Sequence, residues 1–229
     1  MKVIELKSIK HWHDLLETYR SNVYKYRGQS DCDWKLIPKA GRDEFKKTKD
    51  ELIFKQWKRR AGFYLKHQNL NDWELLSIAQ HTGLPTRFLD WSHNPTVALF
   101  FCCSENLDKD GAIFIYPADK YIITENKTPY DVTAEVIFYQ PSTSSDRLAN
   151  QFGYFSVHKN PNKDFIAISK FGSLEKIIIP KNLKKELISM FNQYGINYIS
   201  LFPDLDGLAK HLSWFYQSTE FKGTFLDYE

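Results

Sequence analysis

Apolar residues recur at helical spacing in several parts of the chain, and polar residues mark where the helices begin. Helices are predicted over residues 8–20, 44–66, 71–82, 94–104, 181–194 and 204–217. Ser8 can cap the first, Asn71 opens a capping box for the third, and Gly83 can end that helix. Asn94 followed by Pro95 is a typical helix start. The helix that follows is apolar almost throughout, so we expect it to be buried.

Shorter apolar runs predict strands at residues 23–26, 111–117, 135–139, 154–157, 165–169 and 175–179. The first strand is expected to stop at Arg27-Gly28. Residues 83–93 are expected to form an ordered loop or irregular strand. Because helices and strands do not alternate strictly, we predict an α+β single domain with a mixed or antiparallel central sheet flanked by helices. The helix over 94–104 should pack against one face of that sheet.

The composition excludes some classes of protein and favours others. The 229 residues are 42% hydrophobic with a net charge of +3, so the chain can bury a core and is no polyelectrolyte. The odd, sparse cysteine count (Cys32, Cys102, Cys103) indicates a reducing compartment. No apolar run has the length of a signal peptide or membrane span, so a cytoplasmic protein without membrane contact is expected. No H-E-x-x-H or C-x-x-C occurs, and no metal site is expected.

The adjacent Cys102 and Cys103 are expected to be structural. They lie on the predicted buried helix, where the sequence offers no cationic neighbour that would lower the pKa of either thiol.

A first candidate site is the segment Tyr26-Arg27-Gly28. An arginine at a strand end followed by glycine can hold an anion, because the guanidinium is a planar fork of donors and glycine lets a ligand approach the backbone. The alternative is a structural arginine paired with a carboxylate.

A second candidate site is the polar segment between the third and fourth predicted helices. It holds Gln80, His81, Thr86, Arg87, Asp90 and Trp91. Such polar density between rigid neighbours is typical of a functional site. The alternative is that Arg87 pairs with Asp90 and Trp91 packs in the core, which leaves Gln80, His81 and Thr86 unexplained.

A third candidate is the pair Arg147 and Gln151, four residues apart and thus on one face of a short predicted helix. The alternative here is a surface Arg–Gln pair. A packing role would favour apolar residues in all three segments. We therefore expect the polar groups Arg27, Gln80, His81, Thr86, Arg87, Asp90 and Gln151 to gather in one cleft.

Several segments together resemble the FRG domain family, named for a Phe-Arg-Gly motif that here reads Tyr26-Arg27-Gly28. They are residues 26–30, 36–38, 80–91, 94–95 with 98–101, 151–155 and 201–207. The resemblance runs from Tyr26 to about His211. We therefore treat 1–229 as a single FRG domain with a peripheral helix at about 8–20 and a peripheral tail at about 218–229. The family is found mainly in bacteria and phages.

The order of these elements is also similar to the core of ADP-ribosyltransferases, which implies an ADP-ribosyltransferase-like fold. In that resemblance Arg27 would hold NAD, Thr86 would support the pocket and Gln151 would occupy the position of a glutamate. Glutamine can bind a hydroxyl but cannot act as a base, so Asp90 is the nearest alternative carboxylate.

The sequence thus leads to three hypotheses. The first is an NAD- or nucleotide-handling effector, a toxin or phage-defence protein that transfers or hydrolyses a glycosyl group. The second is a non-catalytic module that binds a nucleotide or nucleic acid, and the third is a scaffold. Under the first, NAD is a substrate and no metal is needed. The proposed catalytic residues are Arg27, Asp90 and Gln151, and the proposed ligand-binding residues are Tyr26, Gly28, Gln80, His81, Thr86, Arg87, Trp91 and Arg147.

Overall fold

The computed structural model describes residues 1–65, 69–141, 151, 153–165 and 167–217. In this part of the chain the strands are β1 (Lys2–Glu5), β2 (Tyr24–Gln29), β3 (Phe88–Ser92), β4 (Gly111–Pro117), β5 (Val136–Tyr139), β6 (Gly153–His158) and β7 (Glu175–Ile179). The helices are α1 (Ile9–Thr18), α2 (Asp50–Ala61), α3 (Asp72–His81), α4 (Pro95–Cys103), α6 (Lys181–Gln193), α7 (Tyr198–Leu201) and α8 (Leu205–Gln217). None of the described helices is both long enough and apolar enough to cross a membrane.

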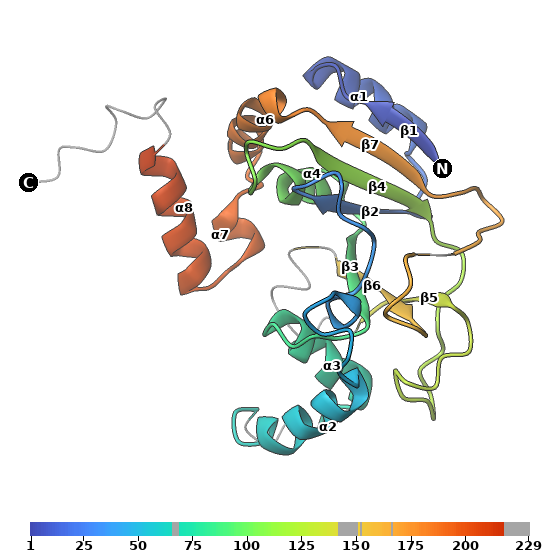
Figure 1. Ribbon diagram of the computed structural model, residues 1–229. Coiled ribbons are helices and arrows are strands. Elements are labelled where there is room, and N and C mark those ends of the chain that lie inside the picture. The colour runs from blue at the N-terminus through green and yellow to red at the C-terminus, as the bar shows by residue number, and fades with distance from the viewer. Residues whose placement is uncertain (66–68, 142–150, 152, 166, 218–229) are drawn as a thin grey trace, which may run out of the picture.

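The strands form one mixed sheet in the order β1-β7-β4-β2-β3-β6-β5. Strand β1 runs parallel to β7, and the other neighbours are antiparallel. Within the described residues, β2 is paired with β3 at one position, Tyr26 with Ser92, whereas its other edge pairs with β4 over its whole length. The sheet therefore consists of a first half-sheet (β1, β7, β4, β2) and a second half-sheet (β3, β6, β5) that diverge from this point (Figure 1).

Separate apolar clusters cover the two half-sheets. Helix α4 packs on β2 together with α1 and α6, which buries Val97, Phe100 and Phe191. Helices α3 and α2 cover the second half-sheet, where Trp73 stacks on Phe88 and Phe54 of α2 joins the same cluster. A third cluster lies on the face opposite α4, and its aromatic side chains come from β3, β4 and β5 and from Phe165, which follows β6.

Most of the predicted elements are present, and the α+β class with a mixed sheet is confirmed. Helix α4 is buried as expected, and Asn71 and Glu74 form the predicted capping box of α3. Cys102 and Cys103 are buried, and burial raises the pKa of the Cys102 thiol. The segment 83–93 contains a regular strand, β3, rather than an irregular one. Strand β1 and helix α7 were not predicted.

Two predicted boundaries and one predicted strand are wrong. The helix expected over 44–66 is shorter in the structure, where α2 spans Asp50–Ala61. The residues before Asp50 form turns, and the helix ends before Gly62. The strand expected at 165–169 does not form among its described residues, where Ser169 makes an isolated bridge to Gly172. Strand β2 does not stop at Arg27-Gly28 but continues to Gln29, because the backbone stays paired with β4.

Gly28 is required by the packing of β2 against α4. A Cβ atom there would lie 1.8 Å from the Ala98 carbonyl oxygen and 2.8 Å from the Cys102 nitrogen. Both are main-chain atoms, so the helix itself would have to move. The glycine thus allows β2 and α4 to pack closely. The sequence analysis had instead explained this glycine by the approach of a ligand to the backbone.

Gly28→Ala is expected to lower the free energy of unfolding by about 2–3 kcal/mol, the cost of overpacking against a rigid backbone. The matched control is Gly62→Ala, where a Cβ meets nothing and the backbone is already helical. That change is expected to raise stability by about 0.4–1 kcal/mol. Chemical denaturation of both variants measures the difference, and equal stabilities would contradict this account of Gly28.

Candidate ligand-binding cleft

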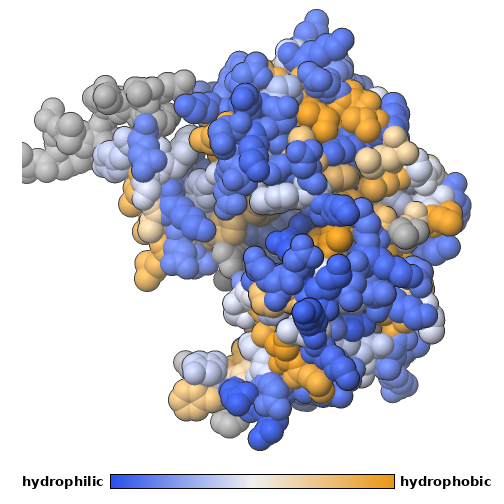
Figure 2. Space-filling view, viewed as in Figure 1, coloured by the Kyte–Doolittle hydropathy of each residue, from blue (hydrophilic) through white to orange (hydrophobic). Residues whose placement is uncertain are grey.

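A cleft of about 340 Å³ opens where β2 and β3 diverge. This volume is within the usual range for small-molecule sites, about 300–1,000 Å³. Figure 2 shows the molecular surface hollowed between its two halves, with hydrophilic side chains around the hollow. The lining comes from several elements: residues 26–30, Trp34, Arg42, His81, residues 90–92, Val97, Ala98, Phe101, Ser104, Glu105, Gln151, residues 153–155 and Phe202.

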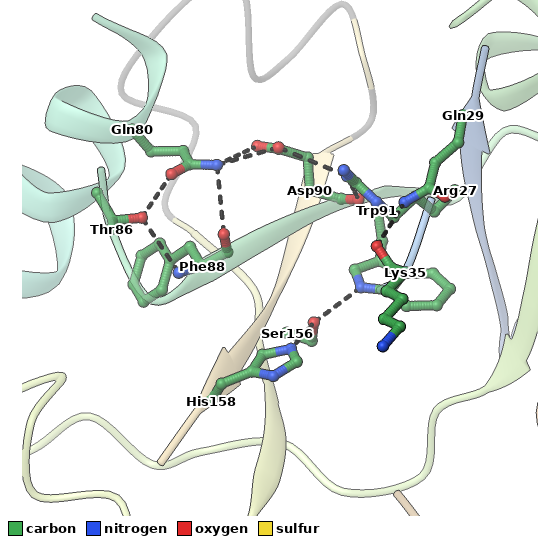
Figure 3. A network of polar contacts seen from close by, with 10 residues as sticks. All are labelled: Arg27, Gln29, Lys35, Gln80, Thr86, Phe88, Asp90, Trp91, Ser156 and His158. Atoms are coloured by element: carbon green, nitrogen blue, oxygen red, sulfur yellow. Dashed lines mark hydrogen bonds and ion pairs between the residues drawn. The ribbon is translucent and has the colours of Figure 1, made fainter. Parts of the chain in front are cut away.

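Arg27 bridges the two half-sheets at the point of divergence. Its Nη1 donates a hydrogen bond to the Asp90 carbonyl oxygen at 2.7 Å and lies 3.6 Å from the Asp90 Oδ2 (Figure 3). Its Nε is buried and has no hydrogen-bond partner in the described structure. Burial lowers the pKa of Arg27, and the Asp90 charge opposes that effect. Arginine remains protonated in proteins, so the cleft wall carries a positive charge with a spare donor.

Asp90 projects from β3 into the cleft, with about half of its side chain (53%) exposed. The Gln80 Nε2 donates to both carboxylate oxygens, at 3.0 and 3.2 Å. The Gln80 Oε1 accepts a hydrogen bond from Thr86, whose hydroxyl oxygen accepts one from the Phe88 backbone (Figure 3). Gln80 and Thr86 therefore orient Asp90 from behind and do not line the cleft.

A second guanidinium, that of Arg42, lines the cleft near Arg27. Its charge is close enough to lower the pKa of Arg27. Arg42 is exposed, and its side chain has no hydrogen bond or ion pair with the residues that the structure describes. His81, at the C-terminal end of α3, lines the cleft as well. Two arginines thus face one space.

The opposite part of the cleft is apolar. Phe101 of α4 and Phe202 lie edge to face, with ring centroids 5.9 Å apart, beside Val97 and Ala98. Gln151 lies nearby, and its Nε2 donates to the Leu201 carbonyl oxygen at 3.0 Å. The side chain of Gln151 is therefore partly committed to holding α7. The lining as a whole suits a ligand with an anionic part and a flat or apolar part.

The structure gathers Arg27, His81, Asp90 and Gln151 around one cleft, as the sequence predicted. The single-cleft prediction is wrong for Gln80 and Thr86, which lie behind Asp90, and for Arg87. The Arg87 Nε and Nη2 donate to the two Asp50 oxygens at 2.8 and 3.0 Å, away from the cleft. The expected Arg87–Asp90 alternative does not form either, because Asp90 faces Arg27.

Two aromatic side chains proposed for ligand binding are core residues. The Tyr26 hydroxyl donates to the Tyr19 carbonyl oxygen, and the Trp91 Nε1 donates to the Ser156 hydroxyl. Both are at most 4% exposed, so neither ring presents a free face. Tyr154, which is half-buried, lines the cleft and can contact a ligand. Arg147 lies outside the described residues.

Sequence reasoning gave no role to several residues that line the cleft: Trp34, Arg42, Phe101, Ser104, Glu105 and Phe202. Arg42 and Glu105 each stand among other charged residues in the sequence. Their spacing does not distinguish them from residues of an ordinary solvated surface. Phe101 and Phe202 fall in segments quoted for the family resemblance, which is the signal that was available.

No separate metal centre emerges from the described residues. One group of potential ligands, Asp31, Cys32 and Asp33, lies together. The Asp31 Oδ2 accepts a hydrogen bond from the Lys109 Nζ at 2.6 Å, and this bond lowers the pKa of Asp31. Its Oδ1 accepts one from the Asp33 backbone, so both oxygens are already used.

A buried polar chain supports the cleft wall behind Trp91. The Ser156 hydroxyl, which binds Trp91, lies 3.2 Å from the His158 Nε2 (Figure 3). Burial lowers the pKa of His158 to about 3, and the charges of Arg27 and Arg87 add to the effect. The imidazole is therefore neutral in the folded protein at physiological pH.

The unfolded chain takes up a proton on His158 near pH 6.5, whereas the folded chain does not. Stability from this group is therefore complete above that pH and is lost as the pH falls. Between pH 7 and pH 5 the loss is expected to be about 2 kcal/mol. Urea unfolding of the wild type and of His158→Gln at both pH values measures it. The free energy of unfolding of His158→Gln should change by about 2 kcal/mol less between the two pH values, because the other titratable groups contribute equally to both proteins. Equal changes in the two proteins would contradict the assignment.

Comparison with known proteins gives a family for part of the chain. The model of the FRG domain matches residues 22–111. No curated protein and no solved structure matches the chain, and the ADP-ribosyltransferase resemblance receives no support. The matched residues include Arg27, Arg42, Asp90 and α4, whereas Gln151 and Phe202 lie beyond them. Residues 22–111, which build most of the cleft, thus match the FRG domain, the family that the sequence motifs resemble.

Proposed function

We propose that the cleft binds an anionic nucleotide, with NAD as the ligand, and that Arg27 and Arg42 hold its phosphates. The observation that carries the proposal is the buried Nε of Arg27, a donor without a partner in the described structure on the wall of the cleft. A buried unsatisfied donor costs about 1–3 kcal/mol. A phosphate oxygen would remove that cost, and the nearby Arg42 would add a second positive charge.

The rest of the lining fits the other parts of such a ligand. Tyr154, Phe101 and Phe202 offer ring surfaces for a base. The Gln151 amide oxygen can accept a hydrogen bond from a ribose hydroxyl while its nitrogen holds Leu201. Every interaction in this scheme uses a group that lines the cleft.

The reaction that this arrangement supports best is cleavage of the nicotinamide–ribose bond. The bond electrons leave with the ring, which neutralises its positive charge, and the ribose C1′ becomes cationic. Asp90, a carboxylate held in place by Gln80, would stabilise that cation until water or an acceptor hydroxyl adds to C1′ and releases a proton. An enzyme that consumes NAD in this way would serve as a toxin or phage-defence effector. The unpaired cysteines fit action in the cytoplasm.

A second candidate function, nucleotide binding without catalysis, is favoured by one observation. The Asp90 carboxylate already faces Arg27 and Gln80, which reduces the negative charge available to a developing cation. A nucleic-acid ligand receives less support, because basic side chains outside the cleft have acidic partners: the Lys46 Nζ lies 4.0 Å from the Asp43 carboxylate, and Lys58 pairs with Asp72.

The test combines calorimetric titration with NAD and chromatographic measurement of free nicotinamide. Asp90→Asn is expected to slow nicotinamide release by at least about 100-fold, the scale of one electrostatic group aimed at the developing charge. Its affinity for NAD is expected to stay within about 3-fold, since asparagine has nearly the same shape. The matched control is Glu125→Gln, an exposed acid that does not line the cleft.

Two results would overturn parts of the proposal. Binding of NAD without nicotinamide release would reject catalysis and establish the binding module. No binding of NAD at millimolar concentration would reject the nucleotide site altogether.

A further inference from the structure

Lys184, on helix α6, is a fully buried lysine. Its Nζ donates hydrogen bonds to the carbonyl oxygens of Ser30 at 2.7 Å, Asn106 at 2.9 Å and Glu105 at 3.3 Å. All three acceptors are main-chain carbonyls. Asp31 is close enough for the ammonium charge to lower its pKa, but its carboxylate is bonded to Lys109.

The three carbonyls belong to two separate segments that line the cleft. Ser30 follows the end of β2, and Glu105 follows α4. The side chain of Asn106 adds a second link between these segments, because its Nδ2 donates to the Ser30 hydroxyl at 2.9 Å. The backbone of Asn106 has a positive φ of 45°, so the loop after α4 turns sharply at this residue.

We propose that Lys184 is a positioning residue that fixes the two walls of the cleft, the end of β2 and the loop after α4, relative to each other. Taking an ammonium group out of water costs several kcal/mol, and an apolar side chain would fill the same space without that cost. What an apolar side chain cannot do is supply three donors to three carbonyls at once. The bonds keep Ser30 and Glu105 facing the same space. The expected effect on ligand binding rests on the proposed nucleotide site, whereas the fixing of the walls does not.

The experiment measures amide hydrogen exchange by mass spectrometry in three variants. Lys184→Gln removes the ammonium but keeps an amide donor. Asn106→Gly removes the side-chain link to Ser30 and suits the positive φ, so it is expected to fold normally. The matched control is Asn126→Gly, at a second asparagine with positive φ (55°), which does not line the cleft.

Exchange in residues 30–33 and 104–110 is expected to rise by about 10-fold in Lys184→Gln and Asn106→Gly, which corresponds to about 1.4 kcal/mol of local opening. The second half-sheet and all of Asn126→Gly should exchange as the wild type does. A rise spread evenly over the chain would show that Lys184 only stabilises the fold, and no rise in either segment would reject the link. Either result overturns the proposal.

Calorimetric titration with NAD then relates this positioning to binding. The affinity is expected to fall by about 10-fold in Lys184→Gln and to be unchanged in Asn126→Gly. A local rise in exchange with an unchanged affinity for NAD would show that the walls are fixed for another reason, which contradicts the positioning role. If the wild type binds no NAD, the nucleotide proposal fails, and the exchange data still decide whether Lys184 fixes the walls.

Discussion

Arg87→Met is expected to lower the free energy of unfolding by about 3–5 kcal/mol, the cost of leaving one partner of a buried ion pair without the other. Arg87 and Asp50 are each about 10% exposed, and two parallel N–H···O bonds join them. The guanidinium carbon also lies 4.2 Å from the centre of the Tyr130 ring. The pair connects the start of α2 to the residue before β3, so its loss loosens the helical layer over the second half-sheet.

Three companion variants make this expectation specific. Arg87→Lys should recover less than half of the loss, because an ammonium group cannot form the two-bond fork. Asp50→Asn should cost nearly as much as Arg87→Met, and Arg87→Met combined with Asp50→Leu should be more stable than either single change. Guanidinium chloride unfolding of the wild type and of the four variants measures these differences. A cost below about 1 kcal/mol for Arg87→Met would indicate an ordinary surface pair.

A binding measurement on Arg87→Met tests whether Arg87 belongs to the ligand site. Because Arg87 does not line the cleft, the folded fraction of Arg87→Met is expected to bind NAD within about 3-fold of the wild type. A loss of affinity much greater than this, at a temperature where the variant is folded, would restore the role that the sequence suggested.

The predictable parts of the fold are those in which a local pattern has one physical meaning. Asn94 followed by Pro95 and an unbroken apolar run predicts a buried helix, and α4 is one. The capping box depends on two residues three positions apart, Asn71 and Glu74, and was predicted correctly. Strand β1 was missed because its residues are mostly exposed and its pairing partner, β7, lies far along the chain. Pairing between such distant segments leaves little local signal.

The residues of the cleft were likewise predictable only where a local pattern marks them. Arg27, Asp90 and Gln151 could be nominated because each stands in a polar segment, and the structure brings them together. Arg87 was misassigned because its partner, Asp50, lies 37 residues away, and no spacing rule connects the two. Arg42 was missed because its relation to Arg27 depends on how the turns before α2 fold back on the sheet.

Arg27→Ala is expected to reduce the affinity for NAD by about 100-fold, because hydrogen bonds to a charged group contribute about 1.5–3 kcal/mol each and the phosphate would lose more than one. The alternative is that Arg27 serves only to join the half-sheets through its bond to the Asp90 carbonyl oxygen. Under that reading, removal of the guanidinium would lower the melting temperature and leave affinity unchanged. Affinity and melting temperature must therefore be measured on the same variant.

Arg27→Lys and Arg42→Ala separate charge from geometry. Lysine keeps the positive charge but presents one centre, so it should recover part of the melting temperature and little of the affinity. Arg42→Ala removes an exposed guanidinium without a partner among the described residues, and it should weaken NAD binding by about 3–10-fold without changing the melting temperature. An affinity that follows total charge alone, with Arg27→Lys equal to the wild type, would mean that the cleft attracts anions without recognising them. Unchanged affinity in all three variants, with a large fall in melting temperature for Arg27→Ala, would leave Arg27 as a structural bridge between β2 and β3.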